Sequence, residues 1–229
     1  MSPIRPKSLD HVAVWVEDRE ALAALFCDHL GMHVISEDDD FALLGVDAKQ
    51  GKLTLFDAEG PREPGALDRI VLRVGDLDGA VGRLPGGLGV ERRDGIAEFE
   101  APEGLPLGLV GGSGLDYDLD HVVLRVADPE RTARWLSDLG FGRRDERLEI
   151  GGRELRLVAG GAGAEPERPL LNHLAVLVDS AESSREEAER RGFEIAKVVD
   201  AENTLAAFVR GPDGIQVELV EHKPGFSLV

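Results

Sequence analysis

One short motif recurs four times along the chain, and this repetition limits the available folds more than any other feature. The segments LDHVAVWVED, LDRIVLRVGD, LDHVVLRVAD and LNHLAVLVDS begin at Leu9, Leu67, Leu119 and Leu171, at intervals of 58, 52 and 52 residues. Each is rich in β-branched and aliphatic residues and ends at residues that favour a helix N-cap, which predicts a strand followed by a helix. The sequence therefore predicts four copies of one structural unit.

Each copy continues in the same way after its first strand. Three helical patterns, REALAALFCDHL, PERTARWLSDL and AESSREEAERR, stop at Gly31, Gly140 and Gly192, as expected for helix C-termini. In the second copy, Pro85, Gly86 and Gly87 shorten the helix. Short strand-like runs separated by turn residues follow, so each copy is predicted to be a βαβββ module.

The modules are too short to fold alone and are expected to pair. A unit of about 50 residues cannot bury enough apolar surface to be stable by itself. The stretch GGSGLDYDLD, from Gly111 to Asp120, is the best candidate for a linker. We therefore predict two domains of consecutive modules, residues 1–113 and 114–229.

The charge and hydropathy of the chain exclude several partners. The 26 basic and 44 acidic side chains give a net charge of −18, which disfavours nucleic acid and anionic membranes as partners. No apolar run approaches the roughly 20 residues of a membrane span, and the N-terminus has no apolar signal-peptide core. We expect a cytoplasmic protein in which the single cysteine, Cys27, is a small core residue.

Strand alternation predicts which polar side chains share a face. In the third module, His121, Val123 and Arg125 alternate with apolar residues that would pack under the helix. The corresponding set in the fourth module is His173, Ala175 and Leu177, and its last strand presents Gln216, Glu218, Val220 and His222. Two imidazoles and one carboxylate, those of His121, His173 and Glu218, are therefore expected to converge.

Alignment of the four modules shows which copies retain these residue types. The first-strand histidine position reads His11, Arg69, His121 and His173. The last-strand carboxylate position reads Leu55, Gly108, Arg156 and Glu218. The C-terminal half alone keeps two histidines and one carboxylate, a ligand set suited to non-haem Fe(II). We predict Fe(II) there, with Mn(II) or Zn(II) as the alternatives.

These features resemble the vicinal oxygen chelate superfamily, which includes glyoxalase I, fosfomycin- and bleomycin-resistance proteins and extradiol ring-cleavage dioxygenases. The resemblance rests on the repeated LDHV-type strand, the helix ends FCDHLGM and WLSDLGF, and the ending PDGIQVEL. It implies an α+β fold in which four βαβββ modules pair into two cupped, barrel-like domains. The helices would lie outside and the site would lie in a concavity.

The distribution of ligands resembles that of two-domain extradiol dioxygenases, which implies an oxygenase that uses O2 on a small aromatic or hydrophobic dihydroxy compound. Those enzymes carry a tyrosine where this chain has Phe208, and a histidine near Val199 and Asp200. Other side chains would then have to move protons, and His222 and Asp200 are the candidates. Residues expected to line the substrate pocket are Phe208, Val123, Arg125 and Ala175.

Two other functions stay open at this point. A glyoxalase-like isomerase or lyase would use the same metal through an enediolate, and a metal-free relative would bind or sequester a drug-like small molecule. Iron or manganese would favour oxygen chemistry, whereas zinc, nickel or cobalt would favour an isomerase. A homo-oligomer is compatible with all three functions.

Overall fold

The computed structural model describes residues 4–47, 51–144, 147–161 and 166–224, and the outer limits of the predicted domains, residues 1 and 229, lie outside them. The first module contains β1 (Ser8–Val16), α1 (Arg19–His29), β2 (His33–Glu37), β3 (Phe41–Gly45) and β4 (Lys52–Asp57). The second contains β5 (Leu67–Val74), α2 (Leu77–Arg83), β6 (Glu91–Arg93), β7 (Ile96–Glu100), the 3-10 turn η1 (Pro102–Gly104) and β8 (Pro106–Gly111).

The third and fourth modules repeat this order. The third contains β9 (Asp118–Val126), α3 (Pro129–Asp138), β10 (Gly142–Arg144), β11 (Arg147–Ile150) and β12 (Arg153–Ala159). The fourth contains β13 (Leu171–Leu177), α4 (Ala181–Arg190), β14 (Glu194–Asp200), β15 (Thr204–Arg210), the 3-10 turn η2 (Pro212–Gly214) and β16 (Gln216–His222). The predicted fourfold βαβββ organisation and α+β class are confirmed.

The helix boundaries follow from residues that the repeat contains. The side chains of Asp18, Asp76, Asp128 and Ser180 each accept a hydrogen bond from a backbone N–H in the first turn of the helix that follows, which is the N-cap arrangement. Gly31, Gly140 and Gly192 lie just beyond α1, α3 and α4 with φ of 59°, 100° and 82°. Glycine reaches this left-handed conformation without a steric penalty, so the helices end there.

The described strands form two eight-stranded sheets. Each sheet combines one module from the N-terminal half of the chain with one from the C-terminal half. One sheet has the order β14-β15-β16-β13-β1-β4-β3-β2, so it joins the first and fourth modules. The other has the order β10-β11-β12-β9-β5-β8-β7-β6 and joins the second and third. The antiparallel pairs β1–β13 and β5–β9 form the centres of the two sheets.

This arrangement corrects the prediction that modules pair within residues 1–113 and within 114–229. The glycine-rich stretch that we expected to separate two domains connects β8 to β9, whose partner is β5, within one sheet. The chain passes between sheets at the connections after β4 and after β12, which meet at a parallel bridge between Glu63 and Pro169. Glycine and serine favour both linkers and compact connections, so composition alone does not separate the two cases.

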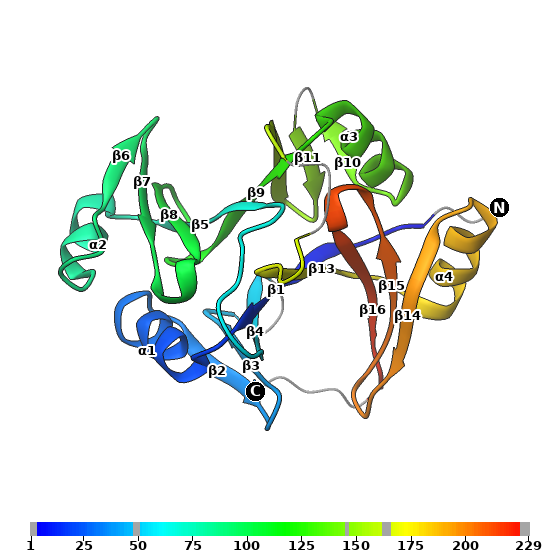
Figure 1. Cartoon of the computed structure of the whole chain (residues 1–229), viewed down its shortest axis with the longest axis horizontal. Helices are drawn as coiled ribbons and strands as arrows, with labels where there is room; N and C mark the ends of the chain where they lie inside the picture. The colour runs from blue at the N-terminus through cyan, green and yellow to red at the C-terminus, as the bar shows by residue number, and fades with distance from the viewer. Residues whose placement is uncertain (1–3, 48–50, 145–146, 162–165, 225–229) are drawn as a thin grey trace.

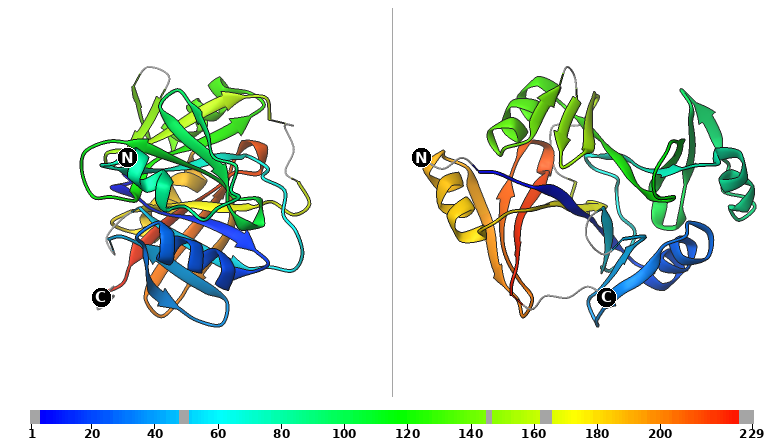
Figure 2. Two further views of the ribbon diagram at one scale, coloured as in Figure 1. Left: turned by 90° about the vertical axis from the view of Figure 1, so that its left-hand side faces the viewer. Right: turned by 180° about the vertical axis from the view of Figure 1, so that it is seen from behind.

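Each sheet separates a helix-covered face from a cup. The four helices lie at the outside of the molecule in Figure 1 and in the right-hand view of Figure 2, while β1 and β13 cross its middle in Figure 1. The apolar residues of β9 and β16 that were predicted to pack under the helices are buried in the main core: Val122, Leu124, Val126, Val217 and Leu219. On the cup side of the first sheet, Ala175, Ala206, Phe208 and Val220 form a separate apolar cluster.

None of the described helices combines the length and apolar character that a bilayer crossing requires.

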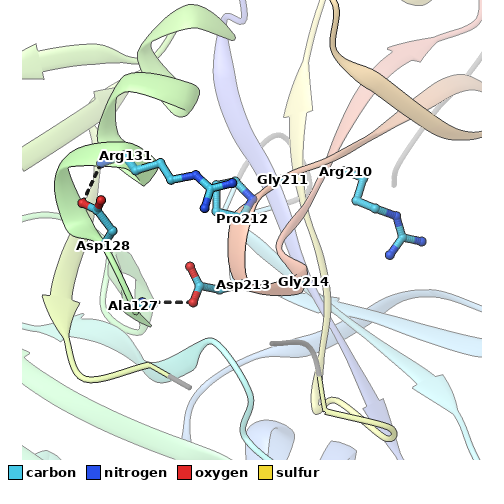
Figure 3. A pocket seen from close by; sticks show the side chains of 8 residues that line it. All are labelled: Ala127, Asp128, Arg131, Arg210, Gly211, Pro212, Asp213 and Gly214. Atoms are coloured by element: carbon cyan, nitrogen blue, oxygen red, sulfur yellow. Dashed lines mark hydrogen bonds between the residues drawn. The ribbon is translucent and has the colours of Figure 1, made fainter. Parts of the chain in front are cut away.

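Consecutive modules contact each other through the two 3-10 turns. The Glu103 carboxylate in η1 accepts a hydrogen bond of 2.8 Å from the N–H of Glu17, just after β1. Asp213 in η2 accepts the equivalent bond of 3.0 Å from the N–H of Ala127, just after β9, beside a hollow of about 290 Å³ (Figure 3). These paired contacts connect the two sheets, so each predicted half holds together without forming a sheet of its own.

The contact of Asp213 gives a prediction about stability. Asp213 has a φ of 56°, which aspartate and asparagine tolerate better than alanine. We expect Asp213→Ala to lower the free energy of unfolding by about 1–2 kcal/mol, because it strains the turn and removes the acceptor of the Ala127 N–H. Asp213→Asn keeps the acceptor and the backbone preference and should unfold in urea close to the parent protein. Equal stability of the parent and the alanine variant would show that the contact contributes nothing.

Candidate metal centre

A cavity of about 530 Å³ fills the cup of the first sheet, and three potential metal ligands meet on its wall. His11 comes from β1, His173 from β13 and Glu218 from β16, three neighbouring strands of the sheet. Nε2 of His11 lies 3.0 Å from Nε2 of His173, and Oε2 of Glu218 lies 2.9 Å from the latter and 3.4 Å from the former.

These separations fit a single divalent metal ion. For metal–ligand bonds of about 2.1 Å, neighbouring corners of an octahedron lie about 3.0 Å apart, and corners of a tetrahedron about 3.4 Å apart. Two of the three edges match the octahedral value, so the ligand atoms can occupy one face of an octahedron. Two histidines and one carboxylate on one face leave the opposite side open for other ligands.

Both histidines are turned so that Nε2 faces the centre. The Nδ1 of His11 lies 2.8 Å from Oδ2 of Asp10, and the Nδ1 of His173 lies 2.9 Å from Oδ1 of Asn172. Because a carboxylate or amide oxygen only accepts hydrogen bonds, Nδ1 of each ring donates, and Nε2 is the nitrogen that can bind a metal when the ring is neutral. The residue before each histidine therefore selects the tautomer that a metal site needs.

Asp10 is the centre of a buried polar network behind His11. Its Oδ1 also accepts a 2.9 Å hydrogen bond from Nζ of Lys52, which is 1 % exposed. Nε2 of His222 lies 3.4 Å from the same oxygen. Burial would raise the pKa of Asp10, but the hydrogen bonds to His11 and His222 and the charge of Lys52 lower it well below its usual range. Asp10 is therefore an anion that orients His11.

The ionisation of the three ligands reflects their mutual contacts. Burial would lower the pKa of His11, but hydrogen bonds to Asp10 and Glu218 raise it to about 9. Burial would raise the pKa of Glu218, but the hydrogen bonds from the two imidazoles lower it well below its usual range. Burial lowers the pKa of His173. Without a metal, one positive charge shared among these groups neutralises the buried carboxylate.

His121 does not belong to this centre, which corrects the predicted ligand set of His121, His173 and Glu218. His121 lies on β9, in the other sheet, and His11 takes its place. The Nδ1 of His121 contacts Oδ1 of Asp120 at 2.7 Å, as the Nδ1 of His11 contacts Asp10, but its Nε2 has no hydrogen-bond partner among the described residues. The prediction is wrong because it assumed that the third module pairs with the fourth.

The second cup has the frame of the first but different residues at the ligand positions. Arg69 stands opposite Val123 in the β5–β9 pair, as His11 stands opposite Ala175 in the β1–β13 pair. The remaining ligand positions hold Gly108 and Arg156. Arg69 pairs with Glu98, and Arg156 donates to Glu154 at 2.8 and 3.1 Å. Ion pairs thus occupy the place where the first cup has its ligand cluster.

The other predicted site residues fall into two groups. His222 and Phe208 line the cavity, and Ala175 is buried in the apolar cluster around Phe208. Val123 and Arg125 lie on β9 in the other sheet, so their prediction as pocket residues is wrong for the same reason as that of His121. The prediction of Asp200 as a proton carrier is also corrected. Its carboxylate is exposed and accepts a hydrogen bond from Lys223, and Asp200 does not line the cavity.

Three contributors to the site were missed by the analysis of the sequence. His11 was left out of the predicted ligand set because the N-terminal half offers no second ligand. Asp10 and Asn172 were not considered, although an aspartate or an asparagine precedes every first-strand histidine. The last-strand position in the first module is Thr54, not Leu55, because Thr54 pairs with Ala13 as Glu218 pairs with Ala175. The signal for Asp10 and Asn172 was present in the LDH and LNH motifs themselves.

The role of Asp10 can be tested against its counterpart in the second cup. Loss of a carboxylate behind a metal-binding histidine typically weakens metal affinity about 10- to 100-fold. We expect this loss for Asp10→Asn, measured by titration of the metal-free protein with Zn(II) or Mn(II). Asp120→Asn alters the same contact to His121 and should leave the affinity unchanged. Equal losses in both variants would contradict the assignment of the metal centre to the first cup.

The fold is shared with solved structures of low sequence identity. A proposed dioxygenase from Bacillus subtilis subsp. subtilis str. 168 superposes with a TM-score of 0.79 at 19% identity, over 96% of this chain and 87% of that one. Glyoxalase I from Zea mays superposes with a TM-score of 0.74 at 20% identity, over 94% of this chain and 92% of that one. A comparison with curated proteins found no match.

A family model matches most of the sequence directly. The model of the Glyoxalase/Bleomycin resistance protein/Dioxygenase superfamily matches residues 8–86 and 118–219. These two segments contain the first strands of all four modules and all three residues of the ligand cluster. Members of this superfamily generally bind a divalent metal and most are enzymes. The chain belongs to the Glyoxalase/Bleomycin resistance protein/Dioxygenase superfamily.

Proposed function

We propose that the protein is a metal-dependent oxygenase of the extradiol type, with His11, His173 and Glu218 as the ligands of Fe(II) or Mn(II). The observation that carries the proposal is the set of three ligand atoms separated by 2.9–3.4 Å. The position on β4 that corresponds to Glu218 holds Thr54, so the described residues offer three ligands. Such a facial set supplies adjacent open positions, at which two oxygens of a substrate and O2 can bind together.

The proposed net reaction balances without an external reductant. Both atoms of O2 enter the product of a dihydroxybenzene. The carbon–carbon bond beside one hydroxyl-bearing carbon breaks, and its two ends become a carboxylic acid and an aldehyde. The chain need supply only orientation of the ring, exclusion of water and proton transfer.

Aromatic side chains on the cavity wall suit an aromatic substrate. Trp15, Phe41 and Phe56 form a contiguous group with ring-centroid separations of 5.5 and 5.7 Å. Phe56 and Phe208 also contact the ring of His173, with centroids 6.1 and 5.0 Å away. A flat ring bound at the metal would therefore lie against apolar walls, where offset and edge-on ring contacts are favourable.

One cation at the cavity wall suggests a negatively charged substituent on that ring. Nζ of Lys197 lies 4.2 Å from the centroid of Phe208, and no carboxylate of the described residues forms an ion pair with it. We propose a catechol that carries a carboxylate, with its hydroxyls toward His11 and its carboxylate toward Lys197.

His222 is the proposed proton carrier. It lines the cavity, and the carboxylate of Asp10 lies between it and His11. Phe208 pairs directly with Glu218 on the neighbouring strand and has no proton to donate. His222 can accept a proton from a substrate hydroxyl while Asp10 stabilises the imidazolium that forms.

The direct test is oxygen consumption by protein loaded anaerobically with Fe(II). We expect about one iron per chain and uptake of O2 with a carboxylated catechol, both lost in His11→Ala and retained in His121→Ala, with folding verified by circular dichroism. Tight binding of zinc, nickel or cobalt with isomerase turnover and no O2 uptake would overturn the proposal in favour of a glyoxalase-like enzyme. Absence of any metal would leave a small-molecule binding protein.

Lys197 gives a prediction about substrate selection. Replacement of an exposed ion-pair partner typically costs up to about 1 kcal/mol, or roughly fivefold in binding. We expect Lys197→Gln to raise the KM for a carboxylated catechol about fivefold and to leave the KM for unsubstituted catechol unchanged. An equal change for both compounds would contradict the contact between Lys197 and the carboxylate.

A further inference from the structure

The first and fourth modules form equivalent halves of the sheet that holds the ligand cluster. Thr54 in one half occupies the same position as Glu218 in the other. β4 runs parallel to β1 as β16 runs parallel to β13. Thr54 pairs with Ala13, two residues after His11, and Glu218 pairs with Ala175, two residues after His173. Thr54 therefore occupies the position on β4 that corresponds to Glu218 on β16. A glutamate at this position would complete a set of four ligands.

The hydroxyl of Thr54 has no hydrogen-bond partner in the part of the chain that the structure describes. Thr54 is 4 % exposed, and its Oγ1 forms no hydrogen bond with the described residues. Several other buried polar atoms share this property, but among the residues that line the cavity it is found only for Thr54. A buried hydroxyl without a partner costs about 1–3 kcal/mol, and valine would fill the same strand position without that cost. This observation indicates a bound partner inside the cavity.

The length of the side chain indicates what kind of atom that partner is. The Thr54 hydroxyl lies two bonds from Cα, whereas a glutamate carboxylate oxygen lies four bonds away. The difference of about 2.5 Å is close to the length of one O–H···O hydrogen bond. A metal bound by His11, His173 and Glu218 would therefore be out of reach of Thr54, but one oxygen atom fits between them.

We propose that Thr54 occupies the fourth ligand position without binding the metal, and that its hydroxyl hydrogen-bonds to the oxygen ligand that lies there. That oxygen belongs to water in the resting protein and to a substrate hydroxyl in the complex. The inference rests on the proposed function and goes beyond it, because it assigns a substrate-contacting residue and an orientation of the substrate hydroxyl. Thr54 thereby keeps one position of the metal open and favours oxygen ligands that can accept or donate a hydrogen bond.

The test compares three substitutions with Mn(II) as the metal and 4-nitrocatechol as the ligand. Thr54→Glu should add a fourth ligand, raise the affinity for Mn(II) about tenfold or more and remove one exchanging water, which water-proton relaxation measures. Thr54→Val should keep the affinity for Mn(II) within about twofold and weaken 4-nitrocatechol about fivefold, the loss of one hydrogen bond. Thr54→Ser retains the hydroxyl and should bind 4-nitrocatechol within about twofold of the parent protein.

Contrary results separate this inference from the proposed function. If the parent protein binds Mn(II) but Thr54→Glu changes neither the affinity nor the number of waters, Thr54 does not face the metal and only its assignment is overturned. Equal affinity of Thr54→Val and the parent protein for 4-nitrocatechol would likewise exclude the hydrogen bond. Failure of the parent protein to bind Mn(II) would overturn the metal-dependent function and the role of Thr54 together.

Discussion

The antiparallel pairing of β1 with β13 is the interaction on which the candidate site depends. Its register sets His11 opposite Ala175 and Ala13 opposite His173, so the two imidazoles lie diagonally across the centre of one sheet. β16 then adds parallel to β13 and brings Glu218 beside them. Because side chains alternate along a strand, a shift of one residue would move either histidine to the helix-covered face. The metal centre is thus a product of contact between the first and last modules of the chain.

The same backbone frame supports two different solutions in the two sheets. The β5–β9 pair has the same register, with Arg69 opposite Val123 and Val71 opposite His121. Arg69 pairs with Glu98 and Arg156 pairs with Glu154 at two of its ligand positions, and only His121 retains the oriented imidazole. Arg69 and Arg156 are partly exposed, and each has a carboxylate partner. One cup therefore brings three ligand atoms together beside a cavity, whereas the other holds ion-paired arginines at two of the equivalent positions.

Local patterns in the sequence predicted the modules, but not their partners. The repeat, the N-caps and the terminal glycines identified βαβββ units because each signal acts within a few residues. Strand alternation placed His173 and Glu218 on the cup face for the same reason. The choice of His121 over His11 failed because the pairing of modules depends on contacts between distant strands, and a glycine-rich connection does not specify its path. Thr54 was missed because the alignment of the last strands was one residue out of register in the first module.

The central claim is that one metal ion lies between the first and fourth modules. Anomalous X-ray diffraction from crystals of Mn(II)- or Fe(II)-loaded protein, collected on both sides of the metal absorption edge, tests it directly. The account predicts one peak per chain, about 2.1 Å from Nε2 of His11, Nε2 of His173 and a carboxylate oxygen of Glu218. A peak beside His121 in the second cup, or no peak in the first cup of the loaded protein, would contradict it.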